Sequence, residues 1–226
     1  MPDVLAVVTA TGTEVGKTWL TAEVARALRR RGIEVSCRKP VMSFDPSEEL
    51  TDALVLADAS GEDEQTVCPA HRRYEVAMAP PMAAEVLKEP PFSMAELAAE
   101  LNLPARGIAL IEGVGGPRSP LAGDGDTVSL IELLQPNVVV LVCPAGLGAI
   151  NSALTATDSL ATNEGVPLLI FVNGFDPSDD LHVRNLAWLS NNTAFGLATE
   201  PDAVTDILAE MVPNTLAAPT RPLEVQ

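Results

Sequence analysis

Short runs of consecutive apolar residues alternate with amphipathic segments along most of this chain. The first run is Val4 to Val8, and residues 16 to 31 follow it with Leu20, Val24 and Leu28 at helical spacing. Apolar strands without alternation, separated by helices, are typical of a parallel sheet that is covered on both faces. We therefore predict an α/β fold built on a parallel sheet with helices on both faces.

The same pattern extends over the rest of the sequence. Further strands are predicted at Ile33–Arg38, Ile108–Ile111, Val138–Cys143, Leu168–Val172 and Ala194–Leu197. Helices are predicted over 82–88, 94–101, 149–163 and 203–212. A chain of 226 residues with one continuous pattern fits a single domain, 1–226, better than two domains with separate cores. We expect the proline-rich residues 213–226 to form a surface tail.

The charge balance restricts the partners of the protein. The chain has 14 Lys and Arg against 31 Asp and Glu, and the net charge of −17 disfavours nucleic acid and anionic membranes. We find no signal peptide pattern, and the most apolar run, Val138 to Cys143, is too short to span a bilayer. The protein is therefore expected to be cytoplasmic.

The cysteines and histidines suggest no metal site. Cys37, Cys68 and Cys143 lie far apart without metal-ligand spacing, so we expect buried free thiols in a reducing compartment. His71 and His182 have no evident partner, and we expect both on the surface.

The stretch ATGTEVGKTW, residues 10 to 19, lies between the first strand and the first helix. It contains Gly-Lys-Thr at its end, but Thr11 stands where the common phosphate loop has a glycine. Unpaired N–H groups at a helix N-terminus bind phosphate, and such a position is rare for a chance match. We therefore predict a true phosphate loop, in which Lys17 neutralises the β- and γ-phosphates and Thr18 binds Mg²⁺.

Acidic residues that could complete a magnesium site follow later in the chain. Glu112 ends the strand from Ile108 and leads into a glycine-rich turn, which is a favourable place for a carboxylate facing phosphates. Asp52 is weaker by itself, because it lies in an acidic stretch that reads as a surface loop. Lys39, after a strand, would by itself be read as solvated.

Five segments in order resemble the dethiobiotin synthetase family, which has the P-loop fold. The loop is similar to the family's G-T-x-T-x-V-G-K-T with Ala10 at its first glycine, and this register accounts for the unusual spacing. The other segments are RKPVMS (Arg38–Ser43), TDALVL (Thr51–Leu56), EGVGGPRSPL (Glu112–Leu121) and GLGAIN (Gly146–Asn151).

The resemblance implies a reaction and a set of site residues. The reaction is the ATP-dependent carboxylation and ring closure of 7,8-diaminopelargonate with CO₂ or bicarbonate, giving dethiobiotin, ADP and phosphate. Lys17 and Lys39 are the implied catalytic residues, and Mg²⁺ is held by Thr18, Asp52 and Glu112. The implied nucleotide contacts are Glu14, Val15, Gly16, Lys17, Thr18, Trp19, Asp52, Glu112, Gly113, Val114, Gly115, Asn173 and Gly174. The implied substrate contacts are Thr13, Lys39, Ser43, Gly116 and Asn151.

The resemblance also implies a homodimer, in which Asn151 reaches the substrate of the other subunit. Such a dimer is expected to cover apolar residues around Ala149, Ile150, Ala153 and Leu154. By its position alone Asn151 could instead be the N-cap of a helix, and Asn173 could form an Asn-Gly turn with Gly174.

Three departures from the family leave a second function open. The chain has Ala10, APPM at 79–82 in place of Ser-Pro-His, and Gly146 where some members have lysine. These changes permit a nucleotide-binding sensor of the same fold without ligase activity, although Lys39, Ser43 and Asn151 favour the enzyme. A partition-type ATPase is disfavoured, because its signature lysine is replaced by Gly12.

Overall fold

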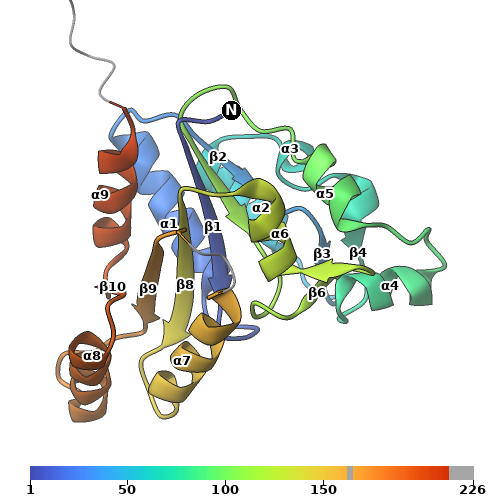
Figure 1. The fold of residues 1–226 in the computed structure, drawn as a ribbon. Helices are drawn as coiled ribbons and strands as arrows, with labels where there is room; N and C mark the ends of the chain where they lie inside the picture. The colour runs from blue at the N-terminus through green and yellow to red at the C-terminus, as the bar shows by residue number, and fades with distance from the viewer. Residues whose placement is uncertain (162–164, 214–226) are drawn as a thin grey trace, which may run out of the picture.

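Six parallel strands form the central sheet of the structure, a computed structural model that describes residues 1–161 and 165–213. In spatial order they are β10 (Gly196–Ala198), β9 (Leu168–Asn173), β8 (Val138–Pro144), β1 (Val4–Ala10), β5 (Ile108–Glu112) and β2 (Val35–Arg38). Every pair of neighbours is parallel, so the predicted parallel sheet is confirmed (Figure 1). The strands β1, β5 and β2 lie side by side, which brings their carboxyl ends together.

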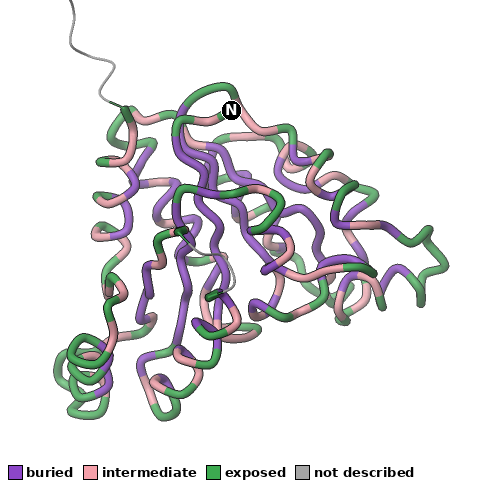
Figure 2. Tube along the Cα trace, in the orientation of Figure 1, coloured by how far each residue is buried: buried purple, intermediate pink, exposed green. Residues whose placement is uncertain are grey.

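Helices cover both faces of this sheet. Residues of β1 alternate between the two cores, with Val4, Ala6 and Val8 in one and Leu5 and Val7 in the other. The first core also contains residues of α1 (Lys17–Arg30), α2 (Asp52–Ser60) and α9 (Pro201–Met211). The second contains residues of α4 (Pro80–Leu87), α5 (Met94–Glu100), α6 (Thr127–Leu134), α7 (Ala149–Leu160) and α8 (Asp180–Asn192). Figure 2 shows the strands of the sheet almost entirely buried between these layers.

Smaller elements surround one end of the sheet. The parallel pair β3 (Met42–Ser43) and β4 (Arg73–Tyr74) lies beside α4 on the right of Figure 1. The short helix α3 (Glu64–Val67) and the 3₁₀ helix η1 (Ala70–Arg72) precede β4. The antiparallel pair β6 (Pro120–Ala122) and β7 (Gly125–Asp126) follows the glycine-rich turn after β5.

Several predicted boundaries were wrong. Strand β2 begins at Val35 and not at Ile33, and the helices α2, α6 and α8 were not predicted. Asp52 is not in a loop, because it is the first residue of α2, where the Thr51 side chain caps the helix by accepting a hydrogen bond from Leu54 N. Helix α7 ends at Leu160. The rest of the helix predicted to 163, and the tail 214–226, lie outside the described residues.

The cysteines and one histidine are as expected. All three cysteines are buried free thiols, and the His71 side chain is 62% exposed beside Glu100. The expectation for His182 was wrong, because its side chain is only 19% exposed and its Nδ1 accepts a hydrogen bond from Asp176 N. Among residues 1–161 and 165–213, we find no helix with the length and hydropathy needed to cross a bilayer.

Candidate active site

The phosphate loop links the buried end of β1 to the first turn of α1. Gly16 is the N-cap of this helix and has no side chain that could cap it, and the first helical hydrogen bond runs from Leu20 N to Gly16 O. The amides of Lys17, Thr18 and Trp19 therefore have no intrahelical acceptor. Three free N–H groups and the positive end of the helix dipole are the features with which helix N-termini bind phosphate in proteins.

Lys39 lies at the centre of a buried cluster of charges. Its side chain is only 3% exposed, and Nζ donates hydrogen bonds to Oδ2 of Asp52 and Oε1 of Glu112, both at 2.6 Å, and to Gly113 O at 3.2 Å. These three acceptors use all three ammonium protons. The reading of Lys39 as a solvated residue is therefore wrong, and the lysine bridges two predicted metal ligands from different elements.

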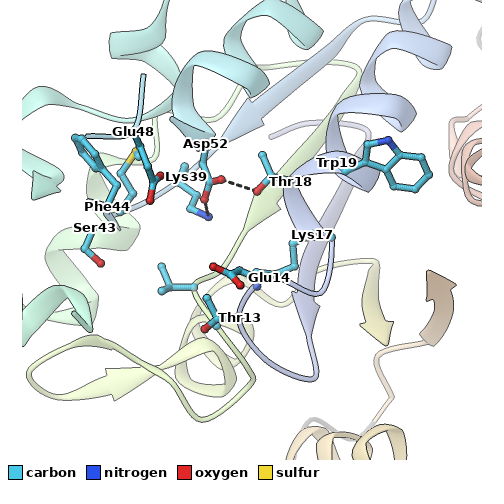
Figure 3. Close-up of a pocket in the computed structure, with 14 residues that line it drawn as sticks. Thr13, Glu14, Lys17, Thr18, Trp19, Lys39, Ser43, Phe44, Glu48 and Asp52 are labelled. Atoms are coloured by element: carbon cyan, nitrogen blue, oxygen red, sulfur yellow. Dashed lines mark hydrogen bonds and ion pairs between the residues drawn. The ribbon is translucent and has the colours of Figure 1, made fainter. Parts of the chain in front are cut away.

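Thr18 joins the same cluster from α1. Its Oγ1 lies 2.8 Å from Oδ1 of Asp52 and 2.8 Å from Oε1 of Glu112, and its one proton can be donated to only one of them at a time. The three residues predicted to bind Mg²⁺ thus meet in the fold, from α1, α2 and the end of β5. Figure 3 shows two of them, Thr18 and Asp52, side by side.

The cluster shifts the pKa values of its members. Burial alone would lower the pKa of Lys39, but the charges of Glu112 and Asp52 and their hydrogen bonds outweigh it and raise that pKa. Burial would raise the pKa of Asp52, but the Lys39 charge and hydrogen bond and the Thr18 hydroxyl lower it. Lys17 has no hydrogen bond to a carboxylate of residues 1–161 and 165–213, and burial, followed by repulsion from Lys39, lowers its pKa to about 8.

The donor set suits a hard divalent cation. Oε2 of Glu112 is buried and has no hydrogen-bond partner in the part of the chain that the structure describes, and it lies on the same carboxylate as the oxygen next to Thr18 and Lys39. Within the described residues, no group of three or more His, Cys, Asp or Glu could hold a metal ion by itself. Two carboxylates and a hydroxyl leave several positions for phosphate oxygens and water, which is the arrangement that Mg²⁺ usually takes.

A cavity of about 450 Å³ opens over this cluster. Eleven predicted site residues line it, namely Thr13, Glu14, Gly16, Lys17, Thr18, Trp19, Lys39, Ser43, Asp52, Val114 and Gly115. Sequence reasoning missed three lining residues, Met42, Phe44 and Glu48. Met42 and Phe44 are the sequence neighbours of the predicted Ser43, and this adjacency could have indicated that they line the cavity.

Seven other predicted site residues do not line this cavity, namely Val15, Glu112, Gly113, Gly116, Asn151, Asn173 and Gly174. Asn173, at the end of β9, does not line it, but its Nδ2 donates a hydrogen bond of 2.9 Å to Val15 O in the phosphate loop. Asn151 lines a neighbouring hollow of about 560 Å³ together with Gly116 and Thr13. Because the N-cap of α7 is Gly148, the alternative that Asn151 caps this helix is wrong.

Comparison with known proteins decides the family. The family described as an AAA domain matches residues 6–209. The ATP-dependent dethiobiotin synthetase BioD of Caulobacter sp. strain K31 is 34% identical over 223 residues, which are 92% of this chain and 95% of that protein. The protein of the same name from Haloferax mediterranei is 31% identical over 86% of this chain and 82% of its own length. The chain belongs to the dethiobiotin synthetase family.

Solved structures place this dethiobiotin synthetase family member among P-loop proteins. Cobyrinic acid a,c-diamide synthase from Mycobacterium smegmatis, with bound ADP and magnesium, superimposes with a TM-score of 0.57 over 95% of both chains at 12% identity. The signal recognition particle receptor FtsY from Elizabethkingia anophelis gives 0.51, also at 12% identity, over 93% of this chain and 65% of that one. At such low identity these superpositions are evidence of the fold alone, and they confirm the predicted P-loop architecture.

Proposed function

We propose that this protein catalyses the ATP-dependent carboxylation and ring closure of 7,8-diaminopelargonate to dethiobiotin. The observation that carries the proposal is the Lys39 ammonium held between Asp52 and Glu112 beside a phosphate loop. A protein that only senses nucleotide needs the loop and the metal ligands, but it needs no second buried lysine at the far end of the phosphates. The names and the coverage of the relatives support the same reaction.

The phosphate loop holds the nucleotide in this proposal. The free amides of Lys17, Thr18 and Trp19 bind phosphate oxygens. Among the described residues Lys17 Nζ donates to Gly12 O alone, so it has two protons left for the phosphates. Lys39 lies at the end of the cavity where the γ-phosphate is transferred. Its positive charge stabilises the charge that develops there, and such stabilisation is a major part of catalysis in phosphoryl transfer.

Thr18, Asp52 and Glu112 are the residues that would hold Mg²⁺. When bound, the ion neutralises charge on the β- and γ-phosphates. The oxygen ligands would be the unpaired Oε2 of Glu112, Oγ1 of Thr18 and Oδ1 of Asp52.

The substrate amines are placed beside Lys39. Ser43 Oγ donates its proton to Met78 O, so its oxygen faces the cavity as an acceptor, which suits an amine. One amine adds to CO₂ and loses a proton to give a carbamate. A carbamate oxygen attacks the γ-phosphorus and displaces ADP, and the second amine then attacks the carbonyl carbon and displaces phosphate. Lys39 neutralises the carbamate and the transferred group in turn.

We also propose that the active site is shared across a homodimer. Asn151 lies on the first turn of α7 and lines a different hollow from Lys39, and Leu147 in the preceding turn is 92% exposed. The expected cover of Ala149 and Ala153 by a partner is wrong, because both are already fully buried in their own chain. Ile150 and Leu154 are only half-buried, so these two residues, together with Leu147 and Asn151, are the ones that a partner would meet.

A direct assay tests the function. The protein is incubated with Mg-ATP, bicarbonate and 7,8-diaminopelargonate, and dethiobiotin and ADP are measured by mass spectrometry. We expect both products in equal amounts, and we expect Lys39→Ala to make neither at a comparable rate. ATP binding without dethiobiotin in the wild-type protein would favour the sensor instead.

A further inference from the structure

Trp19 is a large aromatic side chain on the first turn of α1 that remains 49% exposed. What distinguishes Trp19 from the similarly exposed Trp188 is its place beside the phosphate loop. Its indole lines the cavity of the phosphate loop and packs at a tilted angle near Phe171 of β9, with the ring centroids 6.3 Å apart. One part of the ring is therefore held by the protein, and the rest is open to the cavity.

The place of the Trp19 amide in the first turn of α1 indicates which part of a bound nucleotide the side chain would meet. Its amide is the last of the three free N–H groups at the start of α1, directly after Thr18. Figure 3 shows its side chain pointing away from Lys39 and Asp52. Since the γ-phosphate belongs at Lys39, the α-phosphate and the nucleoside attached to it must extend toward the opposite end, where the indole lies.

We propose that the indole of Trp19 stacks on the base of the bound nucleotide. The proposal rests on the nucleotide-dependent function proposed above. Phe171, which is 1% exposed, supports the ring from the core. This support holds the indole in place before the ligand arrives, which reduces the entropy lost on binding.

In this arrangement Trp19 stacks on the base, whereas Asn173 is the residue that could distinguish one base from another. Every base has an aromatic face, so Trp19 increases the affinity for all nucleotides. Asn173 can offer a base both a donor and an acceptor, because its Nδ2 gives one of its two protons to Val15 O and its Oδ1 accepts no hydrogen bond from the described residues. Replacement of Trp19 should therefore weaken the binding of all nucleotides to a similar degree.

The test compares ADP with tripolyphosphate, which offers the phosphate loop the same kind of phosphate groups but has no base. Trp19→Ala should weaken ADP binding about tenfold and change tripolyphosphate binding less than about twofold, whereas Trp19→Phe should restore most of the ADP affinity. Trp188 on α8 is a matched control, because it is 40% exposed and lies outside the phosphate-loop cavity. Trp188→Ala should leave both affinities unchanged.

Fluorescence gives a second measurement on the same question. The chain has two tryptophans, so Trp188→Phe leaves Trp19 as the only indole. ADP should quench this emission and tripolyphosphate should not. An equal loss of ADP and tripolyphosphate affinity in Trp19→Ala, or no loss of either, would overturn the proposal. Base-dependent binding without dethiobiotin formation would instead overturn only the proposed reaction.

Discussion

Gly16 lies so close to Asn173 that a Cβ atom at position 16 would come within 2.2 Å of the side-chain nitrogen of Asn173. Gly16 also has a φ of +100°, a conformation that residues with a Cβ rarely adopt. The last residue of β9 thus packs directly on the phosphate loop and donates a hydrogen bond to Val15 O in it. Contact between these distant segments keeps the loop in its binding conformation.

The first prediction follows from this contact. Gly16→Ala should displace Asn173 and strain the loop by about 1–3 kcal/mol, so ADP affinity should fall by about tenfold or more. Gly12→Ala is a control in the same loop, because its Cβ would meet only Val15 Cγ2 at an ordinary 3.8 Å. Calorimetry with ADP measures both, and similar affinities in the two variants would contradict the role of the contact.

The second prediction separates the two lysines. Lys17→Ala should abolish nucleotide binding, because Lys17 lies within the phosphate cradle. Lys39→Ala should keep much of the ADP affinity and stop turnover, because Lys39 lies beyond the phosphates of ADP. Calorimetry and the dethiobiotin assay on both variants test this division, and an equal loss of affinity would refute it.

Removal of Lys39 also leaves Glu112, which is 0% exposed, without its cation. An unpaired buried charge of this kind costs about 3–5 kcal/mol, so Lys39→Ala should melt well below the wild type. Mg²⁺ without nucleotide should restore more of this stability in the variant than it adds to the wild type. An equal shift of the melting temperature in both proteins would show that the ion does not bind between the carboxylates.

The third prediction concerns the metal. Asp52→Asn and Glu112→Gln keep the shape of the side chains but remove one charge each, so both should raise the Mg²⁺ concentration needed for half-maximal activity. Glu48→Gln is the matched control, because Glu48 lines the cavity but contacts neither Thr18 nor Lys39. A Mg²⁺ titration with the same shift in all three variants would mean that the general negative potential, and not ligation, is responsible.

The fourth prediction is a pH dependence caused by Lys17, whose pKa in the free protein is lowered to about 8. Below this pH the cation is present before ATP binds. Above it, binding must take up a proton, so affinity should fall by up to about tenfold per pH unit. Lys17→Arg stays charged and should flatten this profile between about pH 7 and about pH 9.5. A wild-type profile as flat as that of the variant would rule out Lys17 as the group.

The same shift affects stability in the opposite sense. The pKa of Lys17 in the folded protein lies below its ordinary value of 10.5, so the unfolded chain binds more protons between about pH 8 and pH 10.5. The contribution of Lys17 to the free energy of unfolding should therefore rise with pH in this window. Denaturant titrations of the wild type and Lys17→Met, which has no titrating group, isolate this contribution.

The fifth prediction tests the shared active site. Lys39→Ala and Asn151→Ala are each expected to be inactive, and their subunits are mixed and allowed to exchange. If Asn151 acts in the partner's site, the heterodimer has one site with both defects and one intact site, so activity should return. Demonstrated exchange without recovery would mean that Asn151 acts within its own chain.

The amino-acid sequence alone determined the strands of the sheet centre and the phosphate loop. The strands β1, β5, β8 and β9 are continuous apolar runs, because both faces of a parallel sheet are buried. The loop was also recognisable, because Gly16, Lys17 and Thr18 act through local backbone geometry at one helix start. The helices α2 and α8 were missed, since α2 is short and alanine-rich and α8 buries only Asn185 and Leu189.

Tertiary structure alone decided how the charged residues act. Lys39 reads locally as a solvated lysine and Asp52 as a loop acid, yet the first is buried and the second begins a helix. They meet Thr18 and Glu112 because β2, β5 and β1 are neighbours in the sheet, and this order is not written in any local pattern. Burial then makes each charge depend on the others, since an unpaired charge in the interior is costly.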